Sequence, residues 1–104
     1  MDGLERPPFS DLKIIDLSSE ISGPYCTKLF VDGGATVVKV ESPDGDLLRR
    51  WRASGKPVPT GMDAPLFQFL NASKQSICLD LHINQDRNIL LQLVTLRLLI
   101  ILAE

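Results

Sequence analysis

The chain has 104 residues, of which 44% are hydrophobic and 23% are charged, and its formal net charge is −2. This composition fits one small globular domain and excludes both a collagen-like repeat and wholesale disorder. The slightly negative charge argues against a nucleic-acid-binding protein, although residues 47–104 carry seven bases against four acids and could attract a small anion.

The first half of the chain predicts a strand, a helix and a second strand. Leu12–Leu17 is a short β-prone run, and the polar turn after it leads to Pro24, a residue favoured at the first helical position. Apolar residues then recur at helical spacing as far as Gly33 and Gly34, which easily adopt a left-handed C-terminal cap. Thr36–Glu41 is typical of a strand covered on both faces. Such a βαβ unit predicts an α/β fold with a parallel sheet.

The middle of the chain is harder to assign. Residues 42–64 contain several Pro and Gly residues and predict a long irregular loop within the domain. Leu66–Leu70 is a short apolar run that favours a buried helical turn, and Ser76–Leu81 predicts a third strand.

The end of the chain predicts one more helix and one more strand. Asn84 is expected to cap a helix that ends near Leu96. The five apolar residues Leu98–Leu102 are typical of a central parallel strand. The helices predicted in this chain are too few to cover both faces of such a sheet. Residues 1–104 are therefore expected to form one incomplete domain, the beginning of a larger fold.

Cysteine usage and the terminal segments indicate the compartment. Cys26 and Cys78 each lie in an apolar run without a His or Cys cluster, which predicts buried, reduced thiols and no metal site. The N-terminus lacks the basic stretch and apolar core of a secretory signal, so a cytoplasmic location is expected. The most apolar segment, Ile89–Ala103, has 15 residues. A membrane span takes about 20 apolar residues, so no membrane association is expected.

Five stretches carry a family resemblance, namely Leu12–Ser18, Ser22–Leu29, Asp32–Glu41, Gly45–Trp51 and Asn71–Leu81. In order and spacing, over residues 12–94, they resemble the family III CoA-transferases. That group includes formyl-CoA transferase, carnitine CoA-transferase and α-methylacyl-CoA racemase. The combination of Gly-Pro-Tyr-Cys-Thr with a downstream Val-Val-Lys-Val-Glu is specific rather than generic.

The resemblance implies the Rossmann-like N-terminal segment of an enzyme that moves CoA between an acyl-CoA and a carboxylic acid. Coenzyme A, as free CoA or acyl-CoA, is then the ligand, no metal is needed, and two subunits interlock as a homodimer. The family's nucleophilic aspartate is expected beyond residue 104, so no catalytic residue is assigned and this chain alone is expected to be inactive. Two alternatives stay open, a fragment of the racemase branch and a truncated, non-catalytic remnant.

By the same resemblance, CoA contacts fall in two segments of this chain. The first is Ile21 and Ser22, in the turn before the first helix, and the second is Leu79, Asp80, Leu81 and His82, after the third strand. Both segments leave the carboxyl ends of strands, where ligands bind in open α/β sheets. The first also precedes a helix N-terminus, whose unpaired N–H groups favour an anion.

Other side chains have competing interpretations. Arg49, Arg50 and Arg52, around Trp51, either hold the nucleotide phosphates or form a solvated basic loop. His82 has no metal-ligating partner in sequence and is better explained as a backbone-level CoA contact or as an exposed residue. Cys26 has apolar neighbours, which favours packing over reactivity.

Overall fold

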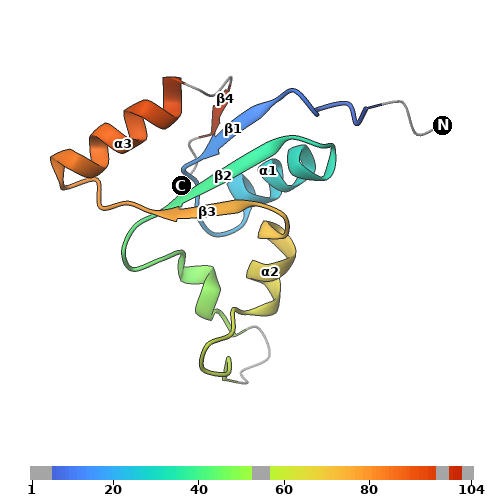
Figure 1. Cartoon of the computed structure of the whole chain (residues 1–104). Helices are drawn as coiled ribbons and strands as arrows, with labels where there is room; N and C mark the ends of the chain where they lie inside the picture. Colours follow the sequence, from blue (N-terminus) through green and yellow to red (C-terminus); the bar gives the residue numbers. More distant parts are fainter. Residues whose placement is uncertain (1–5, 53–56, 96–98, 102–104) are drawn as a thin grey trace.

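The four strands form one parallel sheet in the computed structural model, which describes residues 6–52, 57–95 and 99–101 (Figure 1). The strands are β1 (Lys13–Asp16), β2 (Thr36–Glu41), β3 (Gln75–Cys78) and β4 (Leu99–Ile101). They lie in the order β3-β2-β1-β4. The predicted open α/β sheet is therefore confirmed, and its strand order is the one with which a doubly wound sheet begins.

Helices lie on both faces of the sheet. Helix α1 (Ser22–Asp32), the 3-10 helix η1 (Leu47–Arg50) and helix α2 (Pro65–Asn71) lie on one face, and helix α3 (Asn84–Thr95) lies on the other (Figure 1). Strand residues alternate between the faces because successive side chains point in opposite directions. Two buried clusters follow, one of Ile14, Ala35 and Val37 beneath α1, the other of Ile15, Val38, Val40 and Leu79 beneath α3.

The register between β1 and β2 places charged residues on the α1 face. Ile14 pairs with Val37, and Asp16 pairs with Lys39 two residues further along. Because the side-chain period is two, Asp16 and Lys39 point to the same face as the apolar cluster beneath α1. Both side chains are fully buried, so each needs a partner close by.

Several elements differ from those predicted. Helix α1 begins at Ser22, two residues before Pro24, since proline is tolerated throughout a first helical turn whose N–H groups lack helical partners. Helix α3 begins at Asn84 itself, and the Asn84 carboxamide accepts from the Arg87 guanidinium. Within residues 42–64, η1 replaces part of the expected loop, and Asp46 caps it by accepting from the Leu48 backbone N–H.

Strand β3 is shorter than predicted and β4 is described only in part. Strand β3 ends at Cys78, because the chain turns after Leu79, where the Ile83 N–H donates to the Asp80 carbonyl. Of the predicted strand Leu98–Leu102, residues 99–101 form β4, while residues 98 and 102 lie outside the described residues.

The prediction that both thiols are buried is wrong. Cys78 is exposed and Cys26 is partly exposed. Strand β3 is an edge strand of the described sheet, and three of its four residues are exposed, so an apolar run here did not mean burial. The left-handed turn expected after the first helix is present at Gly34, which has a φ of 104°.

Candidate functional site

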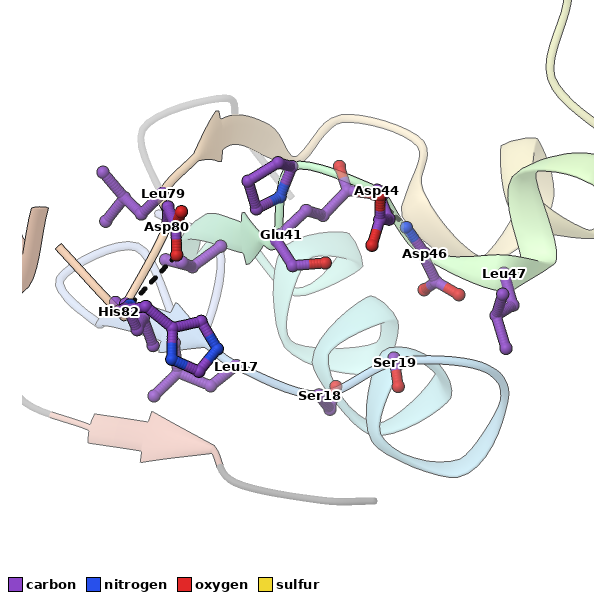
Figure 2. A pocket seen from close by; sticks show the side chains of 15 residues that line it. Leu17, Ser18, Ser19, Glu41, Asp44, Asp46, Leu47, Leu79, Asp80 and His82 are labelled. Atoms are coloured by element: carbon purple, nitrogen blue, oxygen red, sulfur yellow. Dashed lines mark hydrogen bonds between the residues drawn. The ribbon is translucent and has the colours of Figure 1, made fainter.

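A hollow of about 730 Å³ opens at the carboxyl edge of the sheet (Figure 2). Its walls come from the segments that follow β1, β2 and β3, among them Ser18 and Ser19, residues 42–47, and residues 79–82. The carboxyl ends of parallel strands are the usual place for a ligand in an open α/β sheet. The position of the hollow therefore identifies it as the candidate binding site of the described residues.

A second hollow of about 400 Å³ adjoins the first. It is lined by Glu20, Ile21 and Ser22 on one side and by Leu47, Leu48 and Trp51 on the other. Leu47 also lines the larger hollow, so the two cavities are neighbours. The six residues predicted to contact CoA are thus divided between adjacent cavities, with Leu79, Asp80, Leu81 and His82 in the larger and Ile21 and Ser22 in the smaller.

Local hydrogen bonds shape the turn that carries Leu79–His82. The Asp80 carboxylate accepts from the His82 backbone N–H at 3.0 Å, and the Asp86 carboxylate accepts from the Asp80 N–H at 2.7 Å. The Arg87 guanidinium donates to the Leu81 carbonyl at 2.9 Å. Side chains of the first turn of α3 therefore hold the turn in place. His82 is exposed at the mouth of the hollow (Figure 2).

The side chain of Asp16, the last residue of β1, holds the turn between β1 and α1 in place. The Asp16 carboxylate accepts from the Ser18 N–H at 2.8 Å and from the Thr27 hydroxyl at 2.6 Å. Lys74 reaches the same carboxylate at 3.5 Å. Burial lowers the pKa of Lys74 from 10.5 to about 8; the charge of Asp16 opposes this shift and that of Lys39 adds to it.

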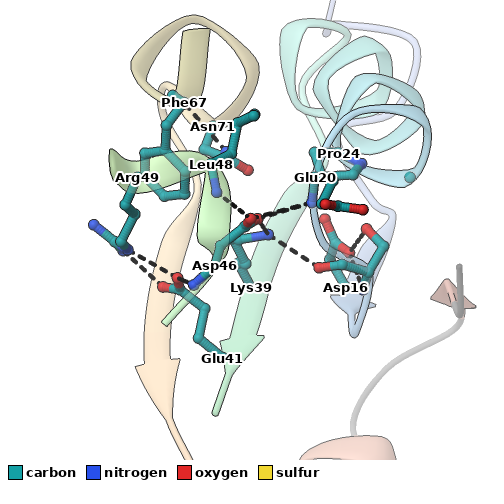
Figure 3. Close-up of polar contacts among 12 residues, drawn as sticks. Asp16, Glu20, Pro24, Lys39, Glu41, Asp46, Leu48, Arg49, Phe67 and Asn71 are labelled. Atoms are coloured by element: carbon teal, nitrogen blue, oxygen red, sulfur yellow. Dashed lines mark hydrogen bonds and ion pairs between the residues drawn. The ribbon is translucent and has the colours of Figure 1, made fainter. Parts of the chain in front are cut away.

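A second buried ion pair joins β2 to the loop after it (Figure 3). Lys39 Nζ lies 3.0 Å from Asp46 Oδ2, and both side chains are 1% exposed. The Asp46 carboxylate also accepts from the Glu20 N–H at 3.1 Å, and Lys39 Nζ donates to the Ser18 carbonyl at 3.0 Å. The pair therefore contacts the β1–α1 turn at two points.

Two of the three arginines considered for phosphate binding make contacts within the chain. Arg49 donates to Glu41 at 2.6 and 2.8 Å and to Asp63 at 2.9 Å, and its guanidinium stacks 4.1 Å from the Phe67 ring centroid. Arg50 donates to the carbonyls of Met62 and Val58. These contacts fold the loop onto η1, and phosphate binding by these arginines stays a prediction.

The Glu41–Arg49 pair perturbs both groups. Burial raises the pKa of Glu41, but hydrogen bonds from Arg49, from the Asp46 backbone and from Ser76 outweigh it and lower the pKa from 4.5 to about 2. The hydrogen bond to Glu41 in turn raises the pKa of Arg49, with a further contribution from Asp63. Glu41 therefore stays ionised as a structural anion at the end of β2.

The larger hollow is acidic. Four carboxylates line it; those of Glu41 and Asp46 are paired with Arg49 and Lys39, while Asp44 and Asp80 have no ion-pair partner among the described residues. Such walls suit a group that donates hydrogen bonds, such as a hydroxyl or an amine, rather than a phosphate. The smaller hollow has one carboxylate among its lining residues, Glu20, and lies beside the N-terminus of α1, which favours an anionic part of a ligand.

Within the described residues, no group of three or more His, Cys, Asp or Glu side chains is arranged to hold a metal ion. Over the same part of the chain, no helix combines the length and apolar character that crossing a membrane requires.

The sequence prediction missed Lys39 and Asp46 as groups that shape the site. One signal was present, since Lys39 interrupts the otherwise apolar run Thr36–Val40 at a position that alternation places in the interior. A lysine that must be buried in a strand requires an acidic or carbonyl partner nearby. The sequence alone does not say which of the acids in residues 41–46 supplies it.

Known proteins that resemble this chain are CoA-transferases. It is 44% identical over 88 residues to succinyl-CoA:mesaconate CoA-transferase of Haloarcula hispanica, an alignment that covers 81% of this chain and 21% of that protein. It is 39% identical over 83 residues to cinnamoyl-CoA:phenyllactate CoA-transferase of Clostridium sporogenes, covering 79% and 20%. The chain thus spans about one fifth of the length of these relatives.

Solved structures agree with the sequence relatives. A CaiB/BaiF family protein from Brucella suis superposes with a TM-score of 0.82 at 31% identity, covering 92% of this chain and 25% of that one. A hypothetical protein from Mycobacterium tuberculosis gives a TM-score of 0.76 at 28% identity, covering 90% and 24%. The family model described as CoA-transferase family III matches residues 9–96. With most of its length matched by that model, the chain belongs to CoA-transferase family III.

Proposed function

We propose that this chain binds the CoA part of an acyl-CoA at the carboxyl edge of its sheet, as the N-terminal part of a CoA-transferase. The observation that carries the proposal is the position of the six expected contact residues, which line two adjoining hollows at that edge. In the larger hollow, the Asp44 and Asp80 carboxylates can accept from the amino and hydroxyl groups of the nucleoside. The start of α1 suits a phosphate.

The proposed reaction transfers CoA from an acyl-CoA to a carboxylic acid. In this proposal the described residues bind and orient CoA, and the carboxylate that attacks the thioester is not among these 104 residues. Covalent catalysis needs the attacking group itself, so the isolated chain should bind CoA without transferring it. Labelled CoA transferred to an acceptor acid by the chain alone would contradict this part of the proposal.

Amide chemical shifts during a titration with CoA test the binding site. The expected result is that Ile21, Ser22 and residues 79–82 shift most, with weak affinity because the two hollows are open to solvent and enclose little of the ligand. Shifts confined to residues 6–11, ahead of β1, would overturn the assigned site.

A matched pair of variants sharpens the test. Leu47 lines both hollows and is 77% exposed, so Leu47→Glu adds a fifth carboxylate where the ligand should lie, without opening the core. It should weaken CoA binding about tenfold through repulsion of the phosphates. Leu91→Glu makes the same change on α3, outside both hollows, and should leave the affinity unchanged. Equal losses in both variants would show that only net charge matters.

A further inference from the structure

One carboxylate holds both walls of the smaller hollow. Asp46 accepts from the Leu48 N–H at 2.9 Å, which caps η1, the element that supplies one wall. It also accepts from the Glu20 N–H, at 3.1 and 3.2 Å from its two oxygens, and Glu20 begins the opposite wall. Figure 3 shows the Asp46 carboxylate between these two segments, with the Lys39 ammonium group beside it.

Glu20 has a backbone conformation that does not arise easily by itself. Its φ is 68°, in the left-handed region that non-glycine residues rarely adopt. Such a residue persists when surrounding contacts determine its conformation. Those contacts are the Asp46 carboxylate on the Glu20 N–H and the Lys39 ammonium group on the Ser18 carbonyl at 3.0 Å. Ile21 and Ser22 follow directly, so their position depends on how Glu20 is held.

We infer that Lys39 and Asp46 are positioning residues, which fix the β1–α1 turn so that Ile21 and Ser22 face the smaller hollow and can contact CoA. The inference rests on the proposed function for its ligand. Both act through the turn; the Asp46 carboxylate also lines the larger hollow, so variants of Glu20 that leave Asp46 unaltered test the turn separately. The pair thereby links β2, the loop after it and the start of α1 into one rigid corner of the site.

Stability alone is a poor explanation for this pair. Replacing a buried ion pair by well-packed apolar side chains of similar volume is often neutral or stabilising, whereas removing one partner is strongly destabilising. A buried pair that also orders a strained turn can instead provide a particular geometry. Stability and ligand binding should then respond differently when both charges are removed together.

The test compares Lys39→Met, Asp46→Asn and the double variant, using thermal unfolding, a CoA titration and hydrogen exchange at the Glu20 amide. Each single variant should lower Tm, because it leaves a buried charge unpaired. The double variant should recover most of that Tm. Its affinity for CoA should stay about tenfold or more below the original, and its Glu20 amide should exchange about tenfold faster, because the Ser18 carbonyl has lost its donor.

An ion pair of α1 whose side chains are 16% and 53% exposed serves as the control. Lys28 and Asp32 lie 2.6 Å apart, and Lys28→Met with Asp32→Asn removes the same two charges. This control should change neither the CoA affinity nor Glu20 exchange by more than about twofold. If the Lys39→Met/Asp46→Asn protein regains Tm, affinity and Glu20 protection together, the positioning role is overturned.

Two variants of Glu20 test the same idea without altering the buried pair, should the double variant fail to fold. Glu20→Pro removes the N–H that Asp46 accepts from and forbids a φ of 68°. Glu20→Gly keeps the N–H and adopts that φ readily. Both variants remove the Glu20 carboxylate that lines the smaller hollow, so they differ only in the backbone, and Glu20→Pro should bind CoA about tenfold more weakly than Glu20→Gly. Equal affinities in the two variants would overturn the inference.

Failure of the proposed function gives a different result. If the unaltered chain shows no shifts on CoA addition, CoA binding is wrong. The effect of the buried pair on the turn is then judged by Glu20 exchange alone. Unchanged exchange at Glu20 in the Lys39→Met/Asp46→Asn protein would overturn it.

Discussion

Glu41 is a buried carboxylate whose ionised form is bound more strongly in the folded than in the unfolded chain. Its pKa is about 2 when folded, against 4.5 for the free side chain, because hydrogen bonds from Arg49 and its other partners outweigh burial. The unfolded chain therefore binds the proton more readily. The stabilisation is fully present above pH 4.5 and is lost as the pH falls toward 2.

We predict that Glu41→Gln removes most of this pH dependence. Each pKa unit corresponds to about 1.4 kcal/mol, so the original chain should lose on the order of 3 kcal/mol across this range from this group. Urea unfolding at a series of pH values between 2 and 6 measures the slope. Asp32→Asn, on the exposed surface of α1, is the control and should keep the original slope. The same slope in Glu41→Gln as in the original would assign the acid sensitivity to other groups.

Substitutions at Gly34 and Gly61 distinguish the cost of backbone strain from the cost of a steric clash. Gly34 has a φ of 104°, and a Cβ built there would lie 2.5 Å from Cβ of Pro7. Gly61 has a φ of 83°, but nothing lies within 4 Å of its added Cβ. We predict that Gly61→Ala costs about 1 kcal/mol from the backbone alone and that Gly34→Ala costs about 2 kcal/mol or more. Chemical denaturation of both variants measures the difference, and equal losses would mean that the segment around Pro7 moves aside freely.

At the scale of elements, the sequence predicts what depends on short-range pattern. The β-branched run 36–41 predicts β2 with the bounds that the structure gives, because burial on both faces leaves a continuous apolar signal. Helix η1 could not be predicted in this way. It exists because Asp46 caps it and because Leu48 packs against Phe67 and Leu70, and both depend on residues brought together by folding.

The candidate site was predictable to a similar extent. Positions at the carboxyl ends of strands follow from topology, so the order of strands and helices in the sequence is enough to place the segments around Ile21 and Leu79 at one edge of the sheet. The roles of the arginines could not be assigned from sequence. A basic loop has the same sequence pattern whether its guanidinium groups are free, or bound to Glu41 and Asp63 as Arg49 is.

A buried hydroxyl of α1 contacts the end of β1. Thr27 is fully buried, and its hydroxyl donates to Asp16 at 2.6 Å. We predict that Thr27→Val, which keeps the shape and removes the donor, costs about 1–3 kcal/mol because a buried carboxylate loses a hydrogen bond. Thr95→Val is the matched control at the exposed end of α3, where the hydroxyl donates to the Gln92 carbonyl, and should cost less than about 0.5 kcal/mol. Equal costs, measured by denaturant unfolding, would contradict a special role for Thr27.

At the scale of the whole molecule, the exposed apolar side chains of α1 and α2 bear on how copies of the chain associate. Ile21, Tyr25 and Leu29 are about half exposed and lie four residues apart, so they form one stripe along α1. Phe69 of α2 is 57% exposed and lies beneath the Lys28 ammonium group, which places it beside that stripe. Adjacent exposed apolar side chains of this kind favour association between molecules.

We therefore predict that the chain self-associates reversibly as its concentration rises, and that Leu29→Glu shifts it toward a mass of 11.5 kDa. A charge within the stripe must be desolvated in any contact that buries it, which weakens the association. Sedimentation velocity over a hundredfold range of concentration measures the effect, and thermal unfolding checks that the fold is retained. Leu91→Glu, at an exposed position of α3 on the opposite face of the sheet, should leave the association unchanged. If Leu91→Glu disperses the protein as well as Leu29→Glu does, net charge rather than the α1 stripe controls the association.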